Sequence, residues 1–168
     1  MRQDSLMSVV VLTGGPAAGK TTVAVAVAKK RDRCAVIDVD DVRHMLHPHV
    51  APWGGEEGQR QQWLGVKNAC ALAANFVADG CDVVITDVLS ADTAALYRSL
   101  IEDVVIIRLA VEIDVAVERA EKRHYFLTAE EFGLLHEVQS FFVSFDLELD
   151  STALGVEDLA DQVCHVLG

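Results

Sequence analysis

Short runs of Val, Ile and Leu recur along the chain and are separated by longer segments of mixed character. An unbroken run of β-branched apolar residues is typical of a strand buried on both faces, as in a parallel sheet. We predict five such strands, at residues 8–13, 34–38, 82–87, 104–109 and 146–150.

The segments between these runs carry helical periodicity or helix caps. They predict helices at residues 19–31, 40–46, 59–79, 90–99, 113–123, 128–142 and 156–167. In the clearest of them, 59–79, apolar residues fall at alternating steps of three and four: Trp63, Val66, Cys70, Ala73 and Val77. This stripe predicts that Trp63 is a core residue. Residues 47–58 are rich in Pro and Gly and predict a loop.

Strands that alternate with helices predict an α/β fold with a mostly parallel sheet, helices on both faces and right-handed crossovers. In such folds the ligand binds at the carboxyl ends of the strands. Polar residues gather at those ends in this chain, so we expect the chemistry there.

Composition narrows the class of protein. A length of 168 residues suits one domain, residues 1–168, and the net charge of −12 with no Lys/Arg cluster disfavours a polynucleotide partner. Scattered cysteines, no signal peptide and no membrane-length apolar run predict a cytoplasmic protein without a membrane partner. A monomer and a homo-oligomer both stay open.

Residues 14–21 fit G-x-x-x-x-G-K-[ST], the phosphate-binding P-loop, between a predicted strand and a predicted helix. Backbone N–H groups and the helix dipole make this an anion site. Lys20 would reach the β- and γ-phosphates, and Thr21 would hold Mg²⁺. The predicted nucleotide-binding residues are Gly14, Gly15, Pro16, Ala17, Ala18, Gly19, Lys20, Thr21 and Thr22. The alternative, an ordinary Gly-rich turn, needs neither Lys20 nor Thr21.

Carboxylates follow two of the predicted strands. Asp38, Asp40 and Asp41 end the second strand, where a carboxylate could deprotonate or orient an acceptor hydroxyl. The alternative is that Asp40 or Asp41 caps the next helix. Asp87 ends the third strand in a Walker-B-like arrangement, where it could hold Mg²⁺, its water shell or the substrate, or cap the helix region at Ser90.

Arg119 and Arg123 are spaced i, i+4 and share one helix face. They could supply positive charge to a transferring phosphoryl group. The alternative is a solvated helix in which Glu118 and Glu121 pair with them. Trp53, in the predicted loop, is a candidate for stacking on an acceptor ring.

These motifs together resemble those of the small P-loop kinases, a group that includes shikimate and gluconate kinases, chloramphenicol phosphotransferase and the kinase half of phage polynucleotide kinase. Residues 40–43 are similar to the D-D-x-R that carries the catalytic Asp and an active-site Arg in polynucleotide kinases, and Val39-Asp40 to the V-D of chloramphenicol phosphotransferase. Both place the base role on Asp40 and bring Arg43 to the substrate. Asp38-x-Asp40 is similar to the D-x-D of shikimate kinase.

The resemblance extends to the second half of the chain. Asp87 matches the acid that ends strand 3, Arg119 with Arg123 matches the lid R-x-x-x-R, and residues 150–152 are similar to the adenine-side loop. The chain departs from the pattern in its short lid, between Arg123 and Thr128, and in lacking the substrate-binding G-G-G of shikimate kinase. The resemblance implies a three-layer sandwich with strand order 2-3-1-4-5.

We therefore expect an ATP-dependent phosphotransferase that moves the γ-phosphoryl of Mg-ATP to a hydroxyl of a small molecule, such as an antibiotic or a metabolite. The expected catalytic residues are Lys20, Asp40, Arg119 and Arg123; substrate contacts are Asp40, Arg43, Trp53 and Asp87; Mg²⁺ ligands, directly or through water, are Thr21 and Asp38. The alternatives are a nucleotide-binding resistance or switch protein with weak ATPase activity, and a nucleotide monophosphate kinase. The acceptor, the choice between ATP and GTP and the identity of the base among the three acids stay open.

Overall fold

Five parallel strands form one sheet in the order β2-β3-β1-β4-β5. The computed structural model describes residues 9–123 and 127–168. The strands are β1 (Val9–Thr13), β2 (Cys34–Asp38), β3 (Asp82–Thr86), β4 (Val105–Ala110) and β5 (Leu147–Asp150). The predicted fold class and strand order are confirmed.

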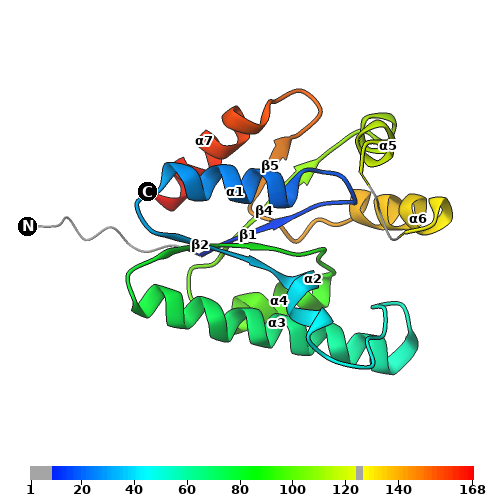
Figure 1. The fold of residues 1–168 in the computed structure, drawn as a ribbon, viewed down its shortest axis with the longest axis horizontal. Coiled ribbons are helices and arrows are strands. Elements are labelled where there is room, and N and C mark those ends of the chain that lie inside the picture. Colours follow the sequence, from blue (N-terminus) through cyan, green and yellow to red (C-terminus); the bar gives the residue numbers. More distant parts are fainter. Residues whose placement is uncertain (1–8, 124–126) are drawn as a thin grey trace, which may run out of the picture.

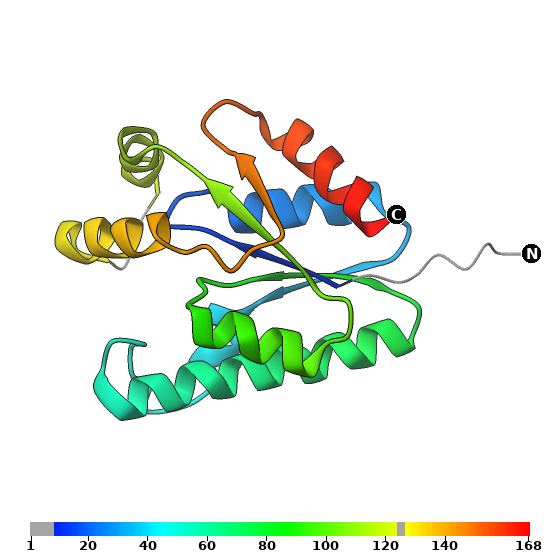
Figure 2. The same cartoon turned by 180° about the vertical axis from the view of Figure 1, so that it is seen from behind.

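Helices cover both faces of this sheet (Figures 1 and 2). They are α1 (Lys20–Lys30), α2 (Val39–His44), α3 (Gly55–Ala78), α4 (Ala91–Leu100), α5 (Ile113–Glu121), α6 (Ala129–Ser140) and α7 (Val156–Leu167). Figure 1 shows α1 and α7 on one face and α2, α3 and α4 on the other. The remaining helices, α5 and α6, lie beyond the carboxyl ends of the strands, where the resemblance places a lid.

The central strands β1, β3 and β4 are mostly apolar because both faces of the sheet are covered there. The edge strand β5 is more exposed and carries Glu148 and Asp150. Successive residues of a strand point to opposite faces, so Val10 and Leu12 pack with α1 and α7 while Val9 and Val11 pack with α3 and α4. The apolar character ends at the carboxyl ends of β2 and β3. The sheet therefore presents its polar residues at one edge, beside the loop that joins β1 to α1.

α3 begins at Gly55, four residues before the predicted start, so the prediction of a loop up to residue 58 was wrong. The two acids of its first turn, Glu56 and Glu57, suit the positive end of a helix dipole. Glu57 also accepts hydrogen bonds from Arg60 and Gln61, one turn further on. These local contacts stabilise the first turn of α3 despite its glycines. The connection between α2 and α3 is therefore shorter than the sequence predicted.

The prediction that Trp63 belongs to the core was also wrong, because 40% of this residue is exposed. The buried face of α3 consists mainly of small residues: Gly58, Gln61, Gly65, Val66, Ala69, Cys70 and Ala73. The predicted stripe holds at Val66, Cys70 and Ala73, which are buried, and at Val77, which packs against the core, so it fails only at Trp63. None of the helices in the described part of the chain is long and apolar enough to cross a membrane.

Candidate active site

The loop between β1 and α1 folds around the side chain of Lys20. The Lys20 Nζ donates hydrogen bonds to the carbonyl oxygens of Gly14 (2.9 Å) and Gly15 (3.0 Å). Gly14 has φ 146°, and a Cβ there would lie 2.5 Å from the carbonyl oxygen of Leu109, so the close approach of loop and β4 requires glycine. Gly19 gives α1 no side-chain cap, which leaves the amides of its first turn to an anion.

Burial lowers the pKa of Lys20, and the negative charges of Asp40, Asp87 and Asp38 oppose that shift. The P-loop lysine therefore lies in the electrostatic field of acids from both β2 and β3. These are the acids that the sequence predicted to meet at the edge of the sheet.

Asp38 joins the P-loop to α2. Its Oδ2 accepts a hydrogen bond from the Thr21 hydroxyl at 3.1 Å, and its Oδ1 accepts one from the Asp40 amide at 3.0 Å. Asp38 is thus the N-cap of α2, so the alternative that Asp40 or Asp41 caps this helix was wrong. A hydroxyl and a carboxylate in contact at the start of α1 are the oxygen ligands that suit Mg²⁺.

Asp40 presents a carboxylate to solvent and holds an arginine behind it. Its Oδ1 lies 2.6 Å from the Arg43 guanidinium; the Asp40 side chain is 59% exposed, whereas that of Arg43 is 11% exposed. Gly65 of α3 makes room for the arginine, since a Cβ there would lie 2.5 Å from the Arg43 Cγ. No sequence pattern indicated this role for Gly65.

Asp87 is buried, and two donors fix its carboxylate. The Tyr97 hydroxyl donates to Oδ2 at 3.0 Å, and the Val88 amide donates to Oδ1 at 2.8 Å. Burial raises the pKa of Asp87 to about 7, against the opposing charge of Arg43. Asp87 does not cap α4, because Ser90 and Thr93 form a capping box there. Sequence reasoning missed Tyr97, because an aromatic residue beside the apolar residues of α4 indicates only a core position.

Arg119 and Arg123 extend from the α5 segment to the P-loop and to the first turn of α1. The Arg119 guanidinium donates to the Ser151 Oγ (2.9 Å) and carbonyl (2.6 Å), and reaches the Ala17 carbonyl at 3.5 Å. Arg123 donates to the Thr22 hydroxyl at 3.2 Å. Among the ion pairs of the residues that the structure describes, Glu118 of α5 pairs with Lys122 rather than with either arginine.

Ser151 connects Arg119 to the P-loop, because its hydroxyl also donates to the Ala18 carbonyl at 2.7 Å. The serine follows β5 and lies in the segment that resembles an adenine-side loop. Sequence reasoning placed the segment near the nucleotide but did not find its contact with Arg119, which depends on how α5 packs.

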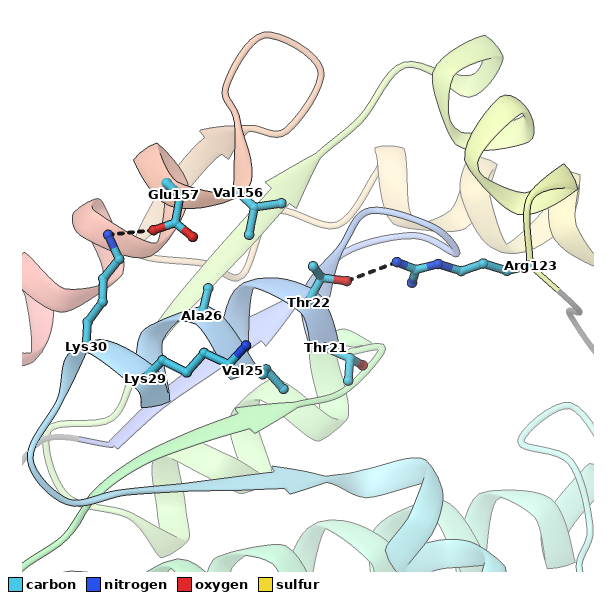
Figure 3. Close-up of a pocket in the computed structure, with 9 residues that line it drawn as sticks. All are labelled: Thr21, Thr22, Val25, Ala26, Lys29, Lys30, Arg123, Val156 and Glu157. Atoms are coloured by element: carbon cyan, nitrogen blue, oxygen red, sulfur yellow. Dashed lines mark hydrogen bonds and ion pairs between the residues drawn. The ribbon is translucent and has the colours of Figure 1, made fainter.

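A cavity of about 400 Å³ opens beside the P-loop, on the outer side of α1 (Figure 3). Its lining residues come from α1, the start of α7 and the end of the α5 segment: Thr21, Thr22, Val25, Ala26, Lys29, Lys30, Arg123, Val156 and Glu157. Figure 3 shows the contact between Thr22 and Arg123 at one end and the ion pair between Lys30 and Glu157 at the other. Apolar side chains between polar ends suit an aromatic base joined to a sugar and phosphates.

α6 closes the opposite side of the loop. Gly15 lies against His136, whose ring would be 3.6 Å from a Cβ on that glycine. Buried Gln139 donates to the Leu89 carbonyl at 2.7 Å and accepts from the Thr13 hydroxyl at 3.4 Å. These contacts fix α6 to the ends of β1 and β3. Neither residue was singled out from the sequence, where both look like ordinary helix positions.

Trp53 is 52% exposed, in the connection between α2 and α3. Gln61 anchors this connection: it accepts from the Val50 amide at 2.8 Å and donates to the Pro48 carbonyl at 3.1 Å. The structure thus leaves Trp53 at the surface beside a fixed support. Its contact with an acceptor stays a prediction.

A family model described as zeta toxin matches residues 2–130, which is most of the chain. The chain belongs to the zeta toxin family. The resemblance to the small P-loop kinases that its motifs indicated is confirmed, and the protein is a member of the P-loop kinase and phosphotransferase group. Comparison with curated protein sequences gives no match.

Solved structures share the fold of this zeta toxin family member at low sequence identity. A sugar kinase from Janibacter sp. HTCC2649 has a TM-score of 0.73 and 18% identity, over 95% of this chain and 93% of that one. Shikimate kinase from Acinetobacter baumannii, solved with shikimate, has a TM-score of 0.69 and 17% identity over 97% and 94%. The APS kinase of Mycobacterium tuberculosis, solved with AMPPNP and APS, has a TM-score of 0.69 and 18% identity over 95% and 96%.

Proposed function

We propose that the protein transfers the γ-phosphoryl group of ATP to a hydroxyl of a small molecule, as Mg-ATP:alcohol phosphotransferase. The observation that carries the proposal is Asp40. Its carboxylate is exposed, and its negative charge opposes the lowering of the Lys20 pKa. It forms an ion pair with Arg43 and does not cap a helix. A P-loop that only binds nucleotide has no use for such a group.

The residues of the chain divide the work as follows. Lys20 and the loop amides hold the β- and γ-phosphates, and the cavity beside Thr22 receives the nucleoside. Thr21 and Asp38 would hold Mg²⁺, which supplies neutralising charge for the phosphates when it is bound. On the acceptor side we place Arg43, Asp87 and Trp53.

Asp40 accepts the proton of the acceptor hydroxyl as the new bond forms between the acceptor oxygen and the γ-phosphorus. The bond from that phosphorus to the β–γ bridging oxygen breaks, and ADP leaves with the electron pair. Arg119 and Arg123 supply positive charge near the transferred group, together with Lys20. The proton then passes from Asp40 to solvent.

Two observations favour an alcohol acceptor over a nucleoside monophosphate. A phosphate acceptor is already a nucleophile and needs no base such as Asp40. It does need cations, and the arginines that the structure describes near the acceptor side, Arg43 and Arg60, are already bound to Asp40 and Glu57.

The test is ATP consumption with a panel of neutral, cationic and anionic alcohols and of nucleoside monophosphates, with product mass measured by mass spectrometry. We expect an alcohol to stimulate consumption and to gain one phosphoryl group. Phosphorylation of a monophosphate instead would favour the nucleotide kinase, and slow hydrolysis that no acceptor stimulates would favour the resistance or switch protein.

The matched variants are Lys20→Ala and Lys67→Ala, since Lys67 is an exposed lysine of α3 away from the loop. Lys20→Ala should nearly abolish transfer while circular dichroism stays unchanged, and Lys67→Ala should behave as wild type. Near wild-type turnover in a folded Lys20→Ala protein would overturn the assignment of the P-loop.

A further inference from the structure

The hydroxyl of Thr86 is buried without a hydrogen-bond partner. Thr86 is 2% exposed, and its Oγ1 contacts no donor or acceptor among the residues that the structure describes. Valine has the same shape and would remove the unpaired group, and strands of this sheet use valine freely. A buried hydroxyl at such a position indicates a partner that is not part of the chain, such as a water molecule or an ion.

The sheet places Thr86 beside the residues that we assign to Mg²⁺. In the strand register Thr86 is opposite Asp38 of β2 on one side and Leu12 of β1 on the other. Val84, two residues earlier, packs in the cluster beneath α1 and α7, so the side chain of Thr86 points to the same face. Asp38 shares that face, because the preceding Ile37 belongs to the opposite cluster.

Thr21, in the first turn of α1, adds a third oxygen-bearing side chain beside Asp38. Figure 3 shows the side chain of Thr21 directed away from that of Thr22. Its hydroxyl donates to Asp38 at 3.1 Å. Thr21, Asp38 and Thr86 therefore present three oxygen-bearing side chains from α1, β2 and β3 at one end of the sheet.

We propose that Thr86 is a positioning residue of the Mg²⁺ site, hydrogen-bonded through Oγ1 to a water molecule of the hydration shell of an ion held by Thr21 and Asp38. The inference rests on the proposed function. Mg²⁺ in proteins keeps several of its waters, and a hydroxyl can both donate to and accept from them. Thr86 is only 2% exposed, so bulk solvent does not satisfy its hydroxyl.

The test compares Thr86→Val with Thr86→Ser. Binding of ADP is measured by calorimetry, first in EDTA and then across a titration of free Mg²⁺. We expect Thr86→Val to raise the Mg²⁺ concentration needed for half of the Mg²⁺-dependent gain in ADP affinity by about tenfold, the scale of a lost partner in a second coordination shell. Thr86→Ser keeps the hydroxyl and should behave as wild type, and all three proteins should bind ADP equally in EDTA.

Binding of Mn²⁺ in the presence of ADP, followed by electron paramagnetic resonance, gives a second readout that does not depend on turnover. An unchanged Mg²⁺ titration in Thr86→Val would overturn the inference and would assign the hydroxyl to a buried water alone. A serine variant as impaired as the valine variant would also overturn it, because packing would then be the cause. If the wild type binds no ADP at all, the proposed function itself fails, and with it the inference.

Discussion

A single carboxylate, Asp40, separates the proposed phosphotransferase from a protein that merely binds nucleotide. Asp38 and Asp40 are two residues apart, yet the structure gives them different surroundings. Asp38 faces Thr21 and caps α2, whereas Asp40 faces solvent and Arg43. Their amide variants should therefore fail in different ways.

Asp40→Asn should lower the transfer rate by roughly a hundredfold or more, the scale of a lost general base, with little change in ATP affinity. Asp38→Asn keeps a capping side chain and should instead raise the Mg²⁺ requirement. The measurement is transfer rate against ATP, Mg²⁺ and acceptor concentration for both variants. Full activity of Asp40→Asn beside an inactive Asp38→Asn without a Mg²⁺ effect would move the base to Asp38.

Asp87 should make stability depend on pH. Its folded pKa of about 7 lies above its ordinary value of 3.8, so between these values the folded chain keeps a proton that the unfolded chain has lost. The free energy of unfolding therefore falls as pH rises through this window, by on the order of a few kcal/mol, and the loss is complete above pH 7.

Asp87→Asn removes this dependence. We expect its melting temperature, relative to that of wild type, to rise between about pH 4 and pH 7 and then stay level. Thermal unfolding of both proteins across this range checks it, and the difference between them cancels the other titrating groups. A difference that does not vary with pH would show that Asp87 is not held as a buried neutral acid.

Among the elements, the connection between α2 and α3 depends on Gln61. This side chain is 4% exposed and satisfies a backbone amide and a backbone carbonyl of the connection at once. These contacts hold in place the connection that contains Trp53.

Gln61→Ala should lower the free energy of unfolding by about 1–3 kcal/mol, because the Val50 amide and the Pro48 carbonyl lose their partner. It should also expose the connection to proteases. Gln62→Ala, at the neighbouring, half-buried position, is the matched control. Chemical denaturation and limited proteolysis give the two readouts, and equal cleavage of both variants would contradict the anchoring role.

Much of the element order could be predicted from the sequence because buried parallel strands leave continuous apolar runs and the P-loop leaves a fixed spacing. Side chains whose partners lie far away along the chain could not. Trp63 was misplaced because the small residues Gly65 and Ala69 share the buried face of α3 with Val66, Cys70 and Ala73, and Trp63 lies outside that face. The contact of Ser151 with Arg119 and the hydrogen bond from Tyr97 to Asp87 were missed because they exist only once α5 and α4 are packed.

At the scale of the whole molecule, the net charge of −12 acts on every approaching anion. Asp38 and Asp40 add to this field beside the P-loop lysine. A nucleotide must therefore approach against a repulsive potential before it reaches the loop amides.

The association rate of a fluorescent ADP analogue should accordingly rise with added KCl, because about a tenfold increase in ionic strength shortens the screening length about threefold. Stopped-flow fluorescence measures this rate, and sucrose in place of KCl controls for viscosity and osmolarity. A rate that falls with salt would show that the local field of the loop dominates over the net charge.

The contacts of Ser151 determine when the P-loop can reach its final structure during synthesis. Ala18 is synthesised 133 residues before Ser151, yet the hydroxyl of that serine donates to the Ala18 carbonyl and accepts from Arg119. An unfinished chain can form β1 and α1 but lacks this clasp and the β5 strand that carries it. Nascent chains halted before residue 151 should therefore hold nucleotide poorly, so that tight nucleotide binding begins only after Ser151 has been added.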